Sequence, residues 1–133
     1  MKIIRILILE DDIETVYKLA GCLSDIQREH EDLDLALTTL SDYFQVERYL
    51  NKEDKNTFDV ILLDRDCFSG GSFHVLDFEK YPLEKIIAIS STPPYNAELK
   101  QRGVKRIVHK DYENLDRFVV EVKQHIEELL GIM

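Results

Sequence analysis

The stretch Asp59-Val60-Ile61-Leu62-Leu63-Asp64-Arg65-Asp66 decides the fold of this 133-residue chain. Four consecutive apolar residues lie between carboxylates, and a glycine-containing segment follows at 67–72. A short unbroken apolar run followed by turn residues is typical of a strand buried on both faces, as in a parallel sheet. Ligands of open α/β sheets bind beyond the carboxyl ends of the strands. Asp64, the last residue of this strand, is therefore a candidate site residue, although an aspartate in this position is by itself more often an acid that caps a turn.

Apolar runs and helical periodicities alternate along the whole chain. Strands are expected at 3–9, 33–40, 60–64, 86–89 and 104–108. Helices are expected at 13–26, 41–50, 73–81, 96–102 and 112–130. This pattern predicts a three-layer, doubly wound α/β domain of the flavodoxin-like type, with a parallel five-stranded sheet in the order 2-1-3-4-5.

Composition narrows the function classes. The net charge of −9 argues against nucleic acid or an anionic membrane surface as a direct partner, because both bind basic patches. No apolar run is long enough to span a bilayer, and acids follow the N-terminal apolar run too early for a signal peptide. The two cysteines, Cys22 and Cys67, have no metal-ligand spacing. We therefore expect one cytoplasmic domain over residues 1–133, with no attached effector domain and no membrane insertion.

Chemically active side chains follow the expected strands. They are Glu10 and Asp11 after the first strand, Asp64 and Asp66 at the third, Ser90 and Ser91 at the fourth, and His109 and Lys110 at the fifth. In a parallel sheet these ends share one edge, so the side chains converge. Like charges about 4 Å apart repel by roughly 4 kcal/mol at an effective dielectric near 20. The repulsion within such a cluster is relieved by a bound cation, by protonation or by a larger separation of the carboxylates. Carboxylate oxygens together with a phosphate are the usual ligands of Mg²⁺.

Four segments in this order resemble the receiver domain of two-component response regulators, over nearly the whole chain. They are LILEDD at 7–12, FDVILLD at 58–64, IIAISS at 86–91 and VHK at 108–110. The resemblance implies a domain that takes a phosphoryl group from a histidine kinase or phosphotransfer protein and signals through protein contacts. It also implies that the domain is not an enzyme but a phosphoacceptor that assists its own phosphorylation and dephosphorylation.

The resemblance also assigns roles to residues. Asp64 becomes the phosphoacceptor and, with Glu10 and Asp11, a ligand of the Mg²⁺ cofactor. Asp66 becomes a metal ligand through its backbone carbonyl. Ser90 and Lys110 become the hydroxyl and the ammonium that bind the phosphoryl group, with Ser91 and Ile107 as accessory positions.

Three positions depart from the receiver pattern. Phe68 stands where the family has proline after the phosphoacceptor, and Asp111 replaces the proline after Lys110. Ile107 occupies the position of an aromatic switch residue. These departures concern signal output more than phosphorylation chemistry.

The sequence leaves two alternatives open. The first is a pseudo-receiver, which uses the fold as a protein-binding module without phosphotransfer. The second is a phosphatase of the haloacid dehalogenase type, because 62–66 matches that family's hydrophobic-DxD motif. The motif of that family, however, normally lies on the first strand. The downstream target stays unidentified, and homodimer formation stays open.

Overall fold

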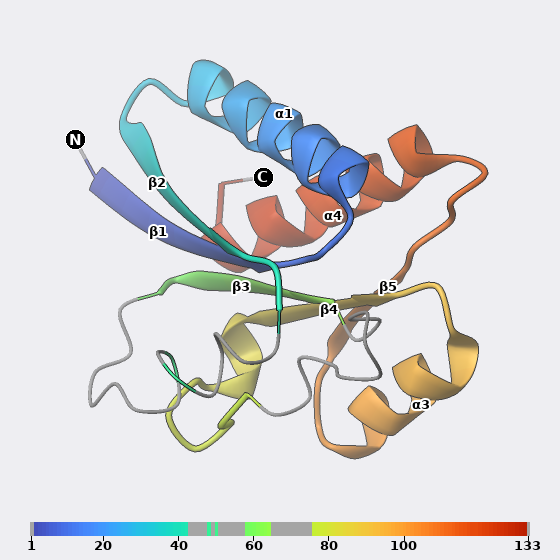
Figure 1. Cartoon of the computed structure of the whole chain (residues 1–133). Helices are drawn as coiled ribbons and strands as arrows, with labels where there is room; N and C mark the ends of the chain where they lie inside the picture. Colours follow the sequence, from blue (N-terminus) through green and yellow to red (C-terminus); the bar gives the residue numbers. More distant parts are fainter. Residues whose placement is uncertain (1, 43–47, 49, 51–57, 65–75, 133) are drawn as a thin grey trace.

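The computed structural model describes residues 2–42, 48, 50, 58–64 and 76–132. Its centre is a parallel sheet in the order β2-β1-β3-β4-β5 (Figure 1). The strands are β1 (Lys2–Leu9), β2 (Leu33–Leu40), β3 (Val60–Asp64), β4 (Ile86–Ser90) and β5 (Arg106–His109). The predicted fold class and strand order are confirmed.

Helices cover both faces of the sheet (Figure 1). Helices α1 (Ile13–Glu29) and α4 (Leu115–Leu130) lie side by side on one face, and α3 (Pro93–Gln101) lies on the other. A short 3₁₀ turn, η3 (Leu83–Lys85), precedes β4. Over the described ranges, no helix combines the length and apolar character needed to cross a membrane.

Strand β3 is fully buried. Its successive side chains point to opposite faces of the sheet, and a layer of the core covers each face. Leu62 packs in the core beneath α1 and α4, together with Ile26 and Val122. Leu63 packs in the second core, which contains Leu99 of α3. Since both faces of this strand are covered, its apolar residues run on without alternation.

Capping explains where α1 begins. The Asp12 carboxylate accepts a hydrogen bond of 3.0 Å from the Thr15 backbone N–H, as an N-cap residue does. The helix continues three residues past the predicted end at Ile26, to Glu29. Strand β2 is at the edge of the sheet, as its alternating pattern predicts.

The prediction of a helix at 73–81 is wrong for residues 76–81, the part that the structure describes. Residues 76–81 form turns, while 73–75 lie outside the described residues. The Asp77 carbonyl accepts from the backbone N–H groups of Lys80 and Tyr81, and its carboxylate accepts from Glu79 N–H. This local bonding of Asp competes with helix formation. Most of the helix predicted at 41–50 also lies outside the described residues.

The boundaries of the last two helices differ from the prediction. Helix α3 begins at Pro93, three residues earlier than predicted, because proline fits the first helical position. Helix α4 begins at Leu115, not at Tyr112, with the Asn114 side chain as its N-cap. It ends at Leu130 and is capped by Gly131, whose φ of 69° suits a glycine.

Two valines of α4 offer a matched stability test. Val122 is fully buried, whereas Val120 is 57% exposed. We expect Val122→Ala to lower the free energy of unfolding by about 2 kcal/mol, because it removes buried methyl groups and leaves a cavity. Val120→Ala should change it by less than about 0.5 kcal/mol. Urea unfolding monitored by circular dichroism measures both, and equal losses would contradict this packing of α4.

Candidate functional site

Four strand ends bring their polar side chains to one edge of the sheet. The register pairs Leu9 with Leu63, Asp64 with Ile89, and Ser90 with His109, so the ends are level. The chemically active side chains follow directly. Glu10, Asp64, Ser90 and Lys110 are each at most 2% exposed. Of the predicted site residues, Glu10, Asp64 and Lys110 lie in direct contact, while the roles predicted for them stay predictions.

Lys110 is the centre of this cluster. Its ammonium donates to Glu10 Oε1 and Oε2 at 3.2 Å each, and to Asp64 Oδ2 at 3.4 Å. These ion pairs join residues 100 and 46 positions apart in the sequence. Burial by itself lowers the pKa of Lys110, but the charges of Asp64 and Glu10 outweigh it and raise that pKa. The lysine is therefore fixed as a cation.

One lysine does not neutralise two carboxylates. Burial, followed by the charge of Asp64 and a hydrogen bond with it, raises the pKa of Glu10 to about 9, and Lys110 offsets only part of this effect. The backbone N–H of Asp12 also donates to Glu10 Oε1, at 3.1 Å. Without a bound cation, burial and the neighbouring Asp64 therefore favour the protonated form of Glu10.

A divalent cation would replace that proton. Carboxylate oxygens of Glu10, Asp11 and Asp64 all lie within 4.8 Å of one another. Such an all-oxygen set suits a hard cation such as Mg²⁺. Asp11 is partly buried, so the set borders on solvent. Asp66, the fourth predicted ligand, lies outside the described residues.

The Ser90 hydroxyl is engaged with the loop that follows it. Its Oγ accepts from Thr92 N–H at 2.9 Å and donates to the Thr92 carbonyl at 3.3 Å. The Ser90 carbonyl accepts from Lys110 N–H at 2.9 Å and from the Asn96 side chain at 3.4 Å. Ser90 is thus linked to β5 on one side and to α3 on the other.

The accessory positions are placed less centrally. Ser91 is partly buried in the bend after β4. Ile107 lies on β5 and packs against the core on the α3 side of the sheet. The accessory roles of Ser91 and Ile107 stay predictions.

Sequence reasoning missed Tyr112. The centroid of its ring lies 4.9 Å from Lys110 Nζ, within cation–π range. Burial raises the pKa of Tyr112, while a hydrogen bond and the charge of Lys110 partly oppose this shift. The position of Tyr112, two residues after Lys110, could have indicated this contact. The helical periodicity instead assigned Tyr112 to the start of the last predicted helix.

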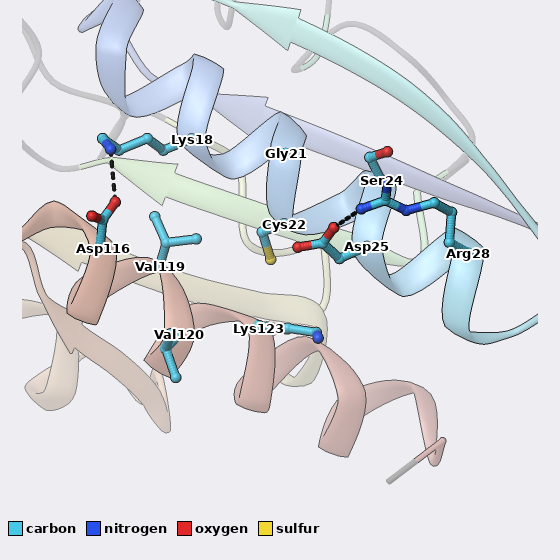
Figure 2. Close-up of a pocket in the computed structure, with 10 residues that line it drawn as sticks. All are labelled: Lys18, Gly21, Cys22, Ser24, Asp25, Arg28, Asp116, Val119, Val120 and Lys123. Carbon is cyan, nitrogen blue, oxygen red and sulfur yellow. Dashed lines mark hydrogen bonds and ion pairs between the residues drawn. The ribbon is translucent and has the colours of Figure 1, made fainter.

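A separate groove of about 440 Å³ lies between α1 and α4 (Figure 2). None of its lining residues belongs to the acidic cluster. Its cations are paired with acids: Lys18 with Asp116 at 2.7 Å, Arg28 with Asp25, and Lys123 with Glu29 at 2.9 Å. The groove is therefore close to neutral and does not resemble a phosphate site.

The raised pKa of Glu10 makes stability depend on pH. The unfolded chain ionises Glu10 near 4.5, whereas the metal-free folded chain keeps the proton to about 9. Because the folded state binds the extra proton, this contribution is complete below pH 4.5 and is lost as pH rises toward 9. We expect the melting temperature without divalent cations to fall by several degrees between pH 5 and 9. Glu10→Gln should flatten this fall, and an equally steep fall in that variant would contradict a protonated Glu10 in the metal-free protein.

Comparisons with known proteins bear on the fold. No protein-family model matches the chain, and no curated protein matches it. Among solved structures, the Mn²⁺-bound form of response regulator Rcp1 is 18% identical, with a TM-score of 0.70, covering 93% of this chain and 91% of its own. The phosphorylated cyanobacterial phytochrome response regulator RcpA is 17% identical, with a TM-score of 0.72, covering 99% of this chain and 97% of its own.

A response regulator receiver domain from Rhodospirillum rubrum is 14% identical, with a TM-score of 0.70 and 94% of both chains covered. These likenesses extend over nearly the whole chain at low sequence identity. The chain therefore has the fold of response regulator receiver domains.

Proposed function

We propose that this chain is a receiver domain that accepts a phosphoryl group on Asp64, in the cytoplasm and with Mg²⁺ as cofactor. The donor is a histidine kinase or a phosphotransfer protein, and the output is a protein–protein contact. The observation that carries this proposal is the buried Lys110 ammonium, 3.4 Å from Asp64 and 3.2 Å from Glu10. The likeness in fold to receivers whose structures are described as Mn²⁺-bound and as phosphorylated supports it.

The proposed chemistry assigns one task to each residue. An oxygen of the Asp64 carboxylate attacks the phosphorus, the bond between phosphorus and the donor's histidine nitrogen breaks, and an acyl phosphate forms. Lys110 pairs with an equatorial phosphoryl oxygen, because its ammonium is already held beside Asp64. A cation bound by Glu10, Asp11 and Asp64 supplies the remaining charge neutralisation. The chain thus positions groups and acts on itself, with no turnover of a separate substrate.

The proposed response begins at Ser90. A phosphoryl group on Asp64 adds negative charge close to the buried Ser90, because the sheet register pairs Asp64 with Ile89, the residue before Ser90. To donate to the phosphoryl group, the Ser90 hydroxyl has to break its hydrogen bond to the carbonyl of Thr92, the residue directly before α3. A change in this loop alters the surface around α3, which a partner protein can recognise.

A pseudo-receiver is the second candidate. The observation that favours it is Ile107, an aliphatic residue packed on the α3 side where receivers carry an aromatic switch residue. In this alternative the fold binds its partner without phosphorylation. A response of the chain to Mg²⁺ and to a phosphoryl mimic distinguishes the two candidates.

Asp64→Asn should abolish Mg²⁺-dependent labelling by a small phosphodonor, because the amide cannot form an acyl phosphate. Asp59→Asn is the matched control at the other end of β3, where the side chain accepts only from Arg5 N–H in the described part of the chain. It should keep wild-type labelling. Acid-stable, hydroxylamine-resistant label in Asp64→Asn would show another acceptor. Turnover of a generic phosphate ester by the wild type would favour the phosphatase alternative.

Mg²⁺ should stabilise the wild-type chain. At a concentration tenfold above the dissociation constant, binding adds about 1.4 kcal/mol to the free energy of unfolding. Asp11→Asn should lose at least half of this gain, whereas Asp34→Asn on the exposed part of β2 should keep it. Thermal unfolding over millimolar Mg²⁺, with and without beryllofluoride, measures the gain. No response in the wild type would favour the pseudo-receiver.

A further inference from the structure

Lys110 has a partner that the proposed chemistry does not use. Its ammonium contacts carboxylates at 3.2 and 3.4 Å and lies 4.9 Å from the centroid of the Tyr112 ring. Lys110 is 1% exposed, but Tyr112 is 54% exposed. A half-exposed ring this close to a buried ammonium forms part of the wall between that ammonium and solvent.

The backbone around Tyr112 is fixed by local hydrogen bonds. The Asp111 carboxylate accepts from Glu113 N–H at 3.0 Å, and the Asp111 carbonyl accepts from Asn114 N–H at 3.1 Å. Asn114 in turn caps α4 through a bond of 3.2 Å from Arg117 N–H. Tyr112 is therefore presented by a turn that is tied to the start of a long, packed helix.

Two further observations agree with a contact between Tyr112 and Lys110. Asp111 is the residue that replaces the proline of the receiver pattern, and its side chain closes the turn that carries Tyr112. The charge of Lys110 also opposes the rise in the pKa of Tyr112 that burial causes, as expected for an ammonium close to the ring.

We propose that Tyr112 is the positioning residue of Lys110 and that it shields the phosphoryl site from water, which lengthens the lifetime of the acyl phosphate. This inference rests on the proposed function of Asp64 as phosphoacceptor. The ring restricts the ammonium to the position beside Asp64 and Glu10. It also fills space through which water would approach the phosphorus.

The step that Tyr112 opposes is hydrolysis. A water oxygen attacks the phosphorus of the acyl phosphate, and the bond between phosphorus and the Asp64 oxygen breaks. The bonding electrons return to the carboxylate, inorganic phosphate leaves, and the proton of the attacking water passes to solvent. Tyr112 takes part in no bond change and acts only through Lys110 and through the exclusion of water.

The kinetic test compares three variants after labelling with a small phosphodonor and Mg²⁺. Tyr112→Leu removes the ring and should shorten the half-life of the acyl phosphate about two- to fivefold, the range of an exposed cation–π contact. Tyr112→Phe keeps the ring and should stay closer to the wild type than the leucine variant does. Tyr17→Leu, at an exposed tyrosine of α1, is the control for general loss of an aromatic residue and should decay like the wild type.

A second readout needs no phosphorylation. In the metal-free protein, the ring current of Tyr112 should shift the ζ proton signals of Lys110, and Tyr112→Leu should remove that shift while Tyr112→Phe keeps it. An unchanged Lys110 signal in the leucine variant would overturn the contact. A labelled wild type with an unchanged half-life in Tyr112→Leu would overturn only the role of Tyr112. A wild type that takes up no phosphoryl group would overturn both this role and the proposed function.

Discussion

The buried ion pairs of Lys110 are the constraint on which the rest of the structure depends. Its ammonium and the carboxylates of Glu10 and Asp64 are nearly inaccessible to solvent. Burying a charge costs several kcal/mol unless a partner compensates for it, so the buried Asp64 carboxylate depends on the lysine. These three residues follow or end three different strands, β5, β1 and β3. The pairing is therefore satisfied only when the strands are in register, which couples the order of the sheet to the geometry of the site.

The same cluster is electrostatically incomplete, and this incompleteness gives the site its chemistry. One ammonium faces two carboxylates, with a third carboxylate from Asp11 nearby. Without a cation the excess charge is removed by a proton on Glu10. A protein selected for stability alone gains little from such an arrangement, because apolar residues of similar volume serve a core as well or better. An arrangement in which a divalent cation can take the place of a proton is instead what the proposed phosphoryl transfer to Asp64 requires.

Sequence was sufficient for the sheet and for most of the site because both follow from the strands. Strands β3 and β4 are buried along their whole length, and β1 is buried over Ile6–Leu9, so their apolar runs identify them. The residues at their ends then follow from parallel topology. The features that the sequence did not predict depend on short-range hydrogen bonds of Asp and Asn side chains. Asp77 and Asp111 bond to backbone N–H groups two residues on, so that turns replace the expected helical segments at 76–81 and 112–114. The position of Tyr112 over Lys110 follows from one of these turns and was missed for that reason.

The connection between site and surface is short in this chain. Ser90 ends β4, only two residues separate it from Pro93, and Pro93 and Pro94 begin α3. The first turn of α3 also reaches back, because the Asn96 side chain donates to the Ser90 carbonyl. Proline restricts the backbone at the start of the helix, so the short connection cannot easily absorb a rotation at Ser90. Ile107 offers no aromatic ring to couple to such a rotation. Under the proposed function, a signal from Asp64 therefore has its most direct route through Ser90 and Thr92 into α3 itself.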